Sequence, residues 1–570
     1  MLSDLLSGRI PIYLPCLSFL LLDVLLLVPS WFVWYIHLHS EGFQTSWSIF
    51  SAFWISIDVL LLVYLLYCTR SSRIYRVVLA LCIALYAFLW IYEIYSKLIV
   101  VLASRKPLLY NDIFLINDGI YLFFDLLKSH WHLLLLVFGL FLFTLLGVIP
   151  AAWKILAHGL QQASFSLSPL LLGFLLLAGA VGMHQVQHTR LEDAPAQLIS
   201  GRIRHNLRNS FALYQETHDP KFQQALQAQI QRTFPPLTFR PDIYVFMIES
   251  YGKILAEHTL LRDEYRTMTS HLESAVTDSG WHAVTNYSIA PISGSGSWLS
   301  TASLLSGIYI DNQVIYDYLT SSYTPPYIRF FRENDYQTLI LEPPSRTRPG
   351  LPLSNQYRFD TVITYHDLWY QDLPHFGWGI IPDQYSLYVT NHAWLNDSSH
   401  PLFFYFPMVT SHAPWTIADL PPYLERVQSR RDFYGVYRQS AQHSSQSTRP
   451  ANPGKPALLW GYSEAIHYAF KVIRDFIIKN VSDSGIIIIL GDHQPPLLVD
   501  ENDSYQTPVH ILSRNPRFLR EFHASGFVQG LHKASDQGDP VRHDSLMAIF
   551  TRTLLTVDEQ HFTNSSAREP

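Results

Sequence analysis

The sequence predicts a helical membrane region of five spans followed by an α/β domain with a mostly parallel sheet. Long apolar runs fill the first third of the chain, and from residue 242 onward short apolar runs alternate with stretches of helical character. The 570 residues are 49% hydrophobic and only 15% charged, whereas soluble domains carry about 25% charged residues. The net charge of −6 provides no electrostatic basis for binding nucleic acid.

The three cysteines, Cys16, Cys68 and Cys82, all lie in the first hundred residues. This position excludes a disulfide framework, a cysteine-based zinc site and a thiol nucleophile from the rest of the chain.

Five apolar stretches have the roughly 20 residues that a membrane-spanning helix needs. They cover approximately residues 15–38, 47–68, 77–103, 131–153 and 167–186. Arg70, Arg73 and Arg76 lie between the second and third stretches, whereas the first loop has no Lys or Arg. The positive-inside rule therefore places the second loop and the N-terminus in the cytoplasm, and everything after residue 187 outside. Arg105 and Lys106 count against this orientation, because they fall in an outer loop.

Acidic residues interrupt the apolar stretches. Residues 111–128 mix acidic and apolar side chains, a pattern typical of an interfacial helix. Asp23, Asp58 and Glu93 lie inside the apolar runs, where a charge is costly and usually faces a cavity or a partner. They either line a path for a lipid headgroup, or they form structural pairs or mark span ends. The second interpretation is favoured, because hydropathy defines span ends only loosely.

The outer part of the chain is predicted to contain linking helices and one large domain. Residues 1–187 form the predicted transmembrane domain, residues 188–238 the linking helices, and residues 239–560 the α/β domain. The apolar runs YVFMI, TLILE, LFFYFPMV and IIIIL read as buried strands between helices, which indicates a doubly wound fold. Residues 427–456 are polar and predict a surface loop.

Two predicted strands end in residues that can bind a metal. Glu249 follows the first strand, and Asp492 and His493 follow the run IIIILG. In doubly wound sheets ligands bind beyond the carboxyl ends of the strands. A single acidic residue there is more often a cap or a turn former. Burying Asp492 and His493 without partners directly after five apolar residues would, however, cost several kcal/mol. Two carboxylates and an imidazole together suit Zn²⁺ or Mn²⁺.

Four serines, Ser293, Ser295, Ser297 and Ser300, lie in a small-residue turn before an apolar run. Composition alone favours a flexible turn with a helix cap. The other interpretation is a hydroxyl nucleophile at a helix N-terminus, where exposed N–H groups attract a phosphate and a metal lowers the hydroxyl pKa.

This order of residues behind five spans resembles the membrane-anchored transferases of the alkaline phosphatase/sulfatase superfamily. These are the lipoteichoic acid synthases and the related phosphoglycerol and phosphoethanolamine transferases. The segments that carry the resemblance are 242–252, 291–309, 401–415 and 485–496. The resemblance implies a sulfatase-like fold and one divalent metal, Zn or Mn, held by Glu249, the nucleophile, Asp492 and His493.

The resemblance also implies which serine is the nucleophile. ASLLSG ends at Gly307, and counting back ten residues, as in sulfatases, gives Ser297. Ser295 is the runner-up. The Pro and Arg that follow the sulfatase nucleophile are absent here, which argues against sulfate-ester hydrolysis. The lack of cysteine in this domain favours the lipoteichoic acid synthase type.

Further residues match substrate-binding positions of that family. His412, which follows the apolar run FFYFPMV, matches a histidine that contacts the substrate phosphate, and a guanidinium at Arg346 or Arg348 suits phosphate recognition. Trp378 and Asp383 match further pocket positions.

The implied reaction is a ping-pong transfer at the outer face of a bacterial cytoplasmic membrane. Ser297 attacks a phospholipid, diacylglycerol leaves, and the phosphoglycerol or phosphoethanolamine group passes to a glycan or glycolipid. Two alternatives stay open: a metal-dependent phosphodiesterase or phosphatase with water as acceptor, and a membrane lipid sensor that has lost its metal. The presence of all four candidate ligands argues against the sensor.

Overall fold

The described residues form two compact units, of which the first ends at Gln215 and the second begins at Glu216. The predicted three-part division at residues 187 and 238 stays a prediction. The computed structural model describes residues 13–39, 55–103, 105–114, 132, 135–162, 196–294, 296–344, 355–377, 381–396, 399–413, 415, 420–443, 457–496, 498–499, 504–533 and 538–557.

Three helical segments of the first unit are long and apolar enough to cross a membrane, namely Leu14–Phe32, Tyr75–Val100 and Leu135–Gln162. They correspond to the first, third and fourth predicted spans. The second prediction, 47–68, is met by a shorter apolar helix over Ile57–Cys68, and the fifth, 167–186, lies outside the described residues. Large side chains such as Leu81 and Leu85 point outward from the third span. An apolar outer surface of this kind is suited to lipid rather than water.

The helices that the structure describes in this unit are α2 (Tyr13–His39), α4 (Ile57–Cys68), α5 (Tyr75–Ala103), α6 (Leu109–Phe114), η1 (Thr144–Val148), α8 (Ile149–Gln162) and α10 (Ile199–His218, which crosses into the second unit). The short strands β1 (Ile55–Ser56) and β2 (Ala196–Gln197) pair in parallel. Of the interfacial helix predicted over 111–128, α6 covers the first four residues, and 115–128 lie outside the described residues.

The acidic residues within the apolar stretches have partners inside the unit. Asp23 accepts a hydrogen bond from the backbone N–H of Ser56 at 3.3 Å. Asp58 accepts from the N–H groups of Ile199 and Ser200, at 2.6 and 3.3 Å. The Asp58 carboxylate therefore satisfies free N–H groups at the start of α10. These contacts favour the structural interpretation over a headgroup path.

Glu93 forms an ion pair with Arg202 of α10. The Glu93 side chain is completely buried, and the Arg202 side chain is 17% exposed. Removing one partner of such a pair leaves a buried charge without compensation, which destabilises the fold strongly. Replacing both partners by apolar residues costs much less.

Arg202→Leu should lower the free energy of unfolding by about 3 kcal/mol, because it leaves the buried Glu93 carboxylate uncompensated. Replacing both residues by leucine should recover most of this loss. Denaturant unfolding of the full chain in detergent measures both variants. A double variant as unstable as the single one would contradict this explanation.

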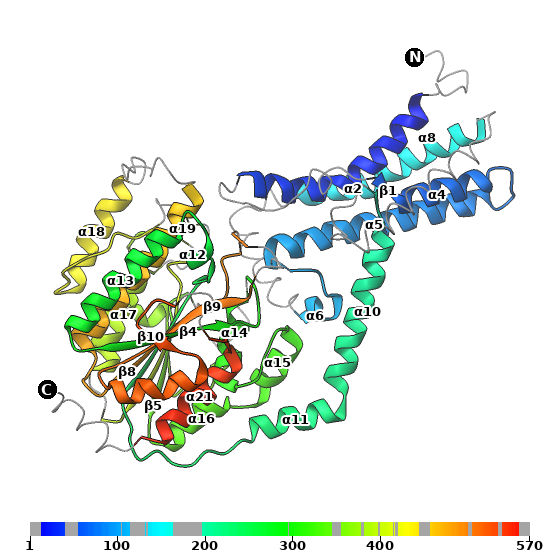
Figure 1. Ribbon diagram of the computed structural model, residues 1–570. Coiled ribbons are helices and arrows are strands. Elements are labelled where there is room, and N and C mark those ends of the chain that lie inside the picture. Colours follow the sequence, from blue (N-terminus) through cyan, green and yellow to red (C-terminus); the bar gives the residue numbers. More distant parts are fainter. Residues whose placement is uncertain are drawn as a thin grey trace. The chain divides into compact units, whose positions relative to one another are not determined.

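The second unit contains a nine-stranded sheet with helices on both faces (Figure 1). Strands β8, β3, β7, β5 and β6 are neighbours in that order and run parallel. Beyond β8 the order continues with β9, β4 and β10, each antiparallel to its neighbour, and β11 pairs in parallel with β4. The strands are β3 (Ile243–Ile248), β4 (His282–Ile289), β5 (Gln337–Glu342), β6 (Thr361–Thr364), β7 (Leu402–Met408), β8 (Ile486–Gly491), β9 (Gln506–Ser513), β10 (Val528–Gln529) and β11 (Val541–Arg542).

The sheet is therefore mixed: five of its strand pairs are parallel, in the sense that the sequence predicted, and three are antiparallel. The antiparallel part begins at β9, which follows β8 along the chain. The described residues between these two strands form no helix, and a parallel pair needs a crossover that is usually helical. The chain instead returns antiparallel.

Two hydrophobic cores cover the two faces of the sheet. Helices α13 (Arg262–Asp278), α17 (Asp383–Thr390), α18 (Arg430–His443) and α19 (Ala457–Asn480) pack on one face, and α14 (Ser297–Ser306), α15 (Gln313–Ser322), α16 (Pro326–Glu333) and α21 (His543–Leu555) on the other (Figure 1). Every residue of β3 and β8 is buried, which explains why these strands are continuous apolar runs. Shorter helices are α11 (Pro220–Ile230), α12 (Ile254–Glu257) and α20 (Pro516–Arg520).

The loop predicted over 427–456 is wrong for its first half, where α18 forms. Asp432 accepts hydrogen bonds from the N–H groups of Gln428 and Ser429, at 2.6 and 2.8 Å, and so holds the start of the helix. Phe433 and Tyr437, four residues apart, are buried on one side of it. The sequence did not predict this helix, because these two buried residues lie in an otherwise mostly polar segment. Residues 444–456 lie outside the described part.

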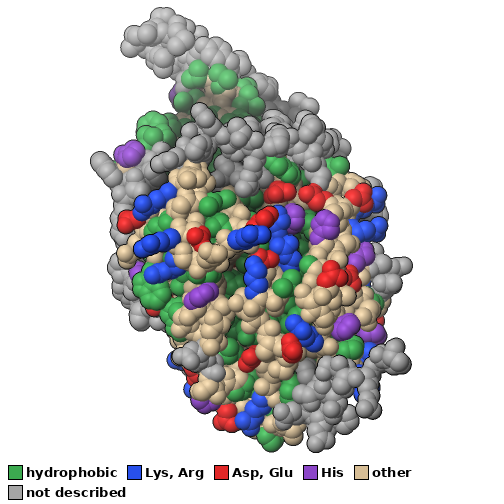
Figure 2. Space-filling view, turned by 90° about the vertical axis from the view of Figure 1, so that its left-hand side faces the viewer, with side chains coloured by type: hydrophobic (Ala, Val, Ile, Leu, Met, Phe, Trp, Pro, Cys, Tyr) green, Lys and Arg blue, Asp and Glu red, His purple; other side chains and the backbone are tan. Residues whose placement is uncertain are grey.

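The surface carries charges of both signs. Figure 2 shows Lys and Arg side chains interspersed with Asp and Glu over one face of the molecule. This distribution agrees with the small net charge of the sequence.

Candidate metal centre

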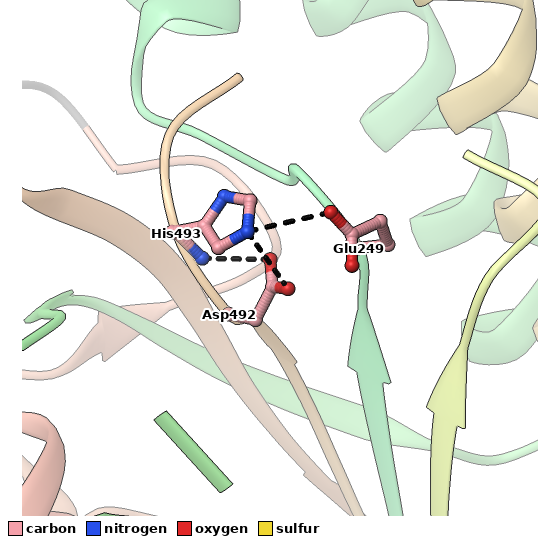
Figure 3. Close-up of side chains that lie close together, drawn as sticks. All are labelled: Glu249, Asp492 and His493. Carbon is pink, nitrogen blue, oxygen red and sulfur yellow. Dashed lines mark hydrogen bonds and ion pairs between the residues drawn. The ribbon is translucent and has the colours of Figure 1, made fainter. Parts of the chain in front are cut away.

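The candidate metal centre lies where β3 and β8 end. These strands are parallel neighbours in register, with Ile248 opposite Gly491, so the residues that follow them emerge side by side. Glu249 follows β3, and Asp492 and His493 follow β8; their side chains converge (Figure 3). All three residues are buried.

The ligand atoms lie at contact distance from one another. His493 Nε2 is 3.3 Å from Glu249 Oε1 and 3.4 Å from Asp492 Oδ2. Ser297 joins the group: its hydroxyl donates to Glu249 Oε2 at 2.9 Å and lies 3.3 Å from His493 Nε2. The structure thus brings together the four residues predicted to hold a metal.

These separations fit a divalent cation. Around a tetrahedral ion with bonds of about 2.0–2.1 Å, neighbouring ligand atoms lie about 3.3 Å apart. His493 Nδ1 is 2.7 Å from the carbonyl oxygen of Gln494 and must donate to it, because a carbonyl only accepts. In the neutral imidazole Nε2 then directs its lone pair at the two carboxylates. Nε2 and the carboxylate oxygens of Glu249 and Asp492 all carry lone pairs, so they need a cation or protons between them. One imidazole nitrogen and two carboxylates are ligands that suit Zn²⁺ or Mn²⁺.

The electrostatics of the two carboxyls differ. Complete burial disfavours the charged form of Glu249, but the nearby His493 and His412 outweigh it and hold the pKa of Glu249 below its usual value. Burial, together with the charge of Glu249, raises the pKa of Asp492 well above its usual value. One carboxylate is therefore readily ionised, and the second needs a cation beside it.

Close packing of the backbone holds the two carboxylates together. A Cβ atom at Gly491 would lie 1.9 Å from the backbone oxygen of Tyr251, so only glycine lets the ends of β8 and β3 approach this closely. Ser250 has a left-handed backbone with φ 59°, which is strained for a residue other than glycine. Its N–H donates to Asp492 Oδ1 at 2.7 Å, and its carbonyl accepts from the Tyr462 hydroxyl at 2.8 Å.

Ser297 is the first residue of α14. The preceding Gly296 has φ 88°, a left-handed conformation that glycine adopts without strain. Ser300, one turn later, donates its hydroxyl to the backbone oxygen of Asp492 at 2.6 Å and so ties the helix to the cluster. The other candidate, Ser295, lies outside the described residues.

His412 lies next to the cluster, after β7. It is half-buried, its Nδ1 contacts the carbonyl oxygen of Ala413 at 2.5 Å, and it is close enough to lower the pKa of Glu249. The preceding Ser411 donates its hydroxyl to the backbone oxygen of Glu249 at 2.7 Å. Ser411 and Tyr462 thus hold the cluster through backbone atoms. Nothing in the sequence signals such contacts.

Asp383, predicted to lie in the substrate pocket, is completely buried. Its two carboxylate oxygens accept from the N–H groups of Val409 and Thr410, each at 3.0 Å, and its own N–H donates to the Thr410 hydroxyl at 3.0 Å. Asp383 therefore holds the turn that carries His412. Arg346, Arg348 and Trp378 lie outside the described residues.

Zn²⁺ or Mn²⁺ should raise the melting temperature of the full chain, because a ligand that binds only the folded state stabilises it by about 2.7 kcal/mol at 100 times its Kd. Asp492→Asn and His493→Ala should abolish this increase and weaken binding in a direct titration. Gln494→Ala keeps all four ligand side chains and serves as the control. If the ion raised the melting temperature of Asp492→Asn and His493→Ala as much as that of the unchanged chain, it would bind at another site.

Burial raises the pKa of Asp383 to about 6, against about 3.9 in the unfolded chain. The folded chain therefore binds this proton more tightly than the unfolded chain. The free energy of unfolding should fall by about 3 kcal/mol from this group as the pH rises from about 4 to about 6. Asp383→Asn should remove that part of the pH dependence. Denaturant unfolding at several pH values measures it, and an unchanged slope in the variant would assign the effect to another group.

No family model and no curated protein matches the chain. Among solved structures it is similar to the lipoteichoic acid synthase LtaP from Listeria monocytogenes, with 15% identity and a TM-score of 0.36 over 59% of this chain and 78% of that one. It is also similar to the C-terminal periplasmic domain of EptC from Escherichia coli, with 14% identity and a TM-score of 0.34 over 59% and 92% of the two chains. For the phosphoglycerol transferase GacH from Streptococcus pyogenes, in complex with sn-glycerol-1-phosphate, the identity is 13% and the TM-score 0.34 over 61% and 86%. A lipoteichoic acid synthase and a phosphoglycerol transferase, two of the groups that the sequence motifs resemble, are thus among the solved structures to which the chain is similar.

Proposed function

We propose that the chain transfers a phospholipid headgroup, phosphoglycerol or phosphoethanolamine, to a glycan or glycolipid through a covalent intermediate on Ser297. The observation that carries the proposal is the contact of the Ser297 hydroxyl with both Glu249 and His493 at the start of α14. A serine that only caps a helix has no need of a buried carboxylate and an imidazole beside its hydroxyl. A serine nucleophile needs such groups, because its hydroxyl must be activated by a base or by a bound metal.

In the first step the Ser297 oxygen forms a bond to phosphorus, and the bond from phosphorus to the diacylglycerol oxygen breaks. The serine proton passes to the leaving oxygen, so diacylglycerol departs as an alcohol. In the second step an acceptor hydroxyl forms the bond to phosphorus and Ser297 regains its proton. A divalent cation held by the four ligands would lower the pKa of the hydroxyl and offset the phosphoryl charge.

The remaining residues of the site support these steps. The N–H groups at the start of α14, a helix of ten residues that begins at Ser297, are proposed to bind the phosphate that Ser297 attacks. His412, beside Glu249, is proposed to contact a phosphoryl oxygen or to carry the proton to the leaving group. Arg346, Arg348 and Trp378 are proposed to bind the headgroup. Asp383 is proposed to act through His412.

The apolar helices of the first unit suit an enzyme whose donor is a lipid. An anchored catalytic domain meets its donor at high local concentration, which favours the first step. We therefore propose a location in a bacterial cytoplasmic membrane with the second unit outside. The predicted five spans and their orientation belong to this proposal.

Incubation of the full chain with vesicles of phosphatidylglycerol or phosphatidylethanolamine and Mn²⁺ or Zn²⁺ should add the corresponding headgroup phosphate to the intact mass. Ser297→Ala should abolish the adduct and lower turnover by at least about 1,000-fold, the scale on which loss of a nucleophile acts. Ser297→Thr keeps a hydroxyl and should retain part of the activity.

Ser295→Ala is the matched control, because it removes the neighbouring candidate hydroxyl. An adduct lost in Ser295→Ala but kept in Ser297→Ala would move the nucleophile to Ser295. An adduct that decays to free headgroup phosphate whether or not a glycan is present would indicate a hydrolase. No adduct with either lipid, despite bound metal, would overturn the proposal.

A further inference from the structure

The second unit has a polar pocket that shares no residue with the metal centre. Its volume is about 320 Å³, near the lower end of the roughly 300–1,000 Å³ typical of small-molecule sites. The pocket is lined by Trp369, Gln371, Asp372, Arg430 and Tyr434. The first three residues follow β6 and the last two belong to α18, so segments distant in sequence form its walls.

Trp369 gives this pocket an aromatic wall. The residue is 49% exposed, which is high for so large an apolar side chain. Its ring stacks on that of Trp394, with centroids 5.9 Å apart and planes at 14°. The Arg430 guanidinium lies over the Trp369 ring, 5.3 Å from its centroid. The orientation of the indole is thus set by two neighbours although half of its surface meets solvent.

The backbone here is held in a costly conformation. Trp369 has φ 49° and ψ 41°, and Asp372 has φ 58°. Aspartate tolerates this left-handed region, but for a tryptophan it is costly, and costly backbone conformations cluster at ligand sites. The Tyr385 hydroxyl, 3.2 Å from the carbonyl of Leu368 and 3.3 Å from that of Trp369, holds the segment in place.

Two polar side chains of the pocket are available to a ligand, whereas Arg430 also interacts with Tyr385 and with the Trp369 ring. Gln371 and Asp372 are exposed, and neither side chain hydrogen-bonds to another residue in the part of the chain that the structure describes. Arg430 lies in the first turn of α18, whose start is held by Asp432. The lining residues thus offer an amide, a carboxylate, a guanidinium and a phenol hydroxyl beside one exposed indole.

These groups match a sugar ring. A pyranose has a face of C–H groups that packs on an indole, and hydroxyl groups around its edge that both donate and accept hydrogen bonds. A purely anionic ligand would meet the charge of Asp372, and an apolar one would leave the polar walls unsatisfied. We propose that this pocket binds a sugar ring of a glycan. This binding site is separate from the residues of the proposed transfer reaction. It can therefore be tested by measuring binding alone, whether or not the chain catalyses the transfer.

The test uses saturation-transfer NMR on the full chain in an amine-oxide detergent, since glycoside detergents would themselves carry a sugar. The probes are the methyl glycosides of glucose, galactose and N-acetylglucosamine. At least one should show saturable transfer. Trp369→Gly removes the indole and suits the left-handed backbone, so it should weaken binding by about tenfold or more without loss of folding. Arg430→Ala should also weaken binding.

Arg431→Ala is the matched control, because it removes the adjacent exposed arginine, which does not line the pocket. Binding should be unchanged in this variant and in Ser297→Ala. Absence of saturable transfer from all three glycosides would overturn the proposal, as would equal binding by Trp369→Gly. Displacement of the sugar by inorganic phosphate with dependence on Arg430 would make the pocket an anion site and would also overturn it.

Discussion

The meeting of two buried carboxylates with the lone pair of an imidazole is the constraint on which the rest of the site depends. Glu249, Asp492 and His493 lie within hydrogen-bonding range of one another, yet in their metal-binding forms all three present only acceptors. Such a group is stable only with a cation or shared protons among its members. Parallel pairing of β3 and β8 makes the approach possible, and Gly491 permits it because any side chain would strike Tyr251.

Each member of this group is held by contacts that do not take part in ligation. The strained Ser250 is tied to Asp492 on one side and to Tyr462 on the other. Ser411 holds the backbone of Glu249, and Asp383 holds the two residues before Ser411. Fixing the ligands in this way reduces the reorganisation needed when a cation or a phosphate arrives. These contacts therefore hold the backbone of the ligands in place before a cation binds.

The sequence predicts much of the parallel half of the sheet, because strands buried on both faces become continuous apolar runs such as Ile486–Gly491. It also predicts the ligands, since polar residues directly after such runs are conspicuous. The antiparallel half could not be predicted, because β9 contains Pro508 and His510 within a buried strand and its partner is set by tertiary contacts. Ser411 and Tyr462 act on backbone atoms, and such contacts leave no trace in residue spacing.

Residues other than glycine with a left-handed backbone lie at both edges of the sheet in this chain. Among the described residues, five other than glycine have a left-handed backbone. Asp335 and Arg358 lie in turns just before β5 and β6, at the amino ends of the strands, where a polar residue tolerates this conformation. Ser250, Trp369 and Asp372 instead follow β3 and β6, at the carboxyl ends, where doubly wound sheets bind ligands. Trp369 ends the short helix Tyr365–Leu368 in the left-handed conformation that glycine usually supplies at such a position. A tryptophan there costs more than a glycine would, and contact between its exposed ring and a ligand is a reason for the chain to carry an indole at this point.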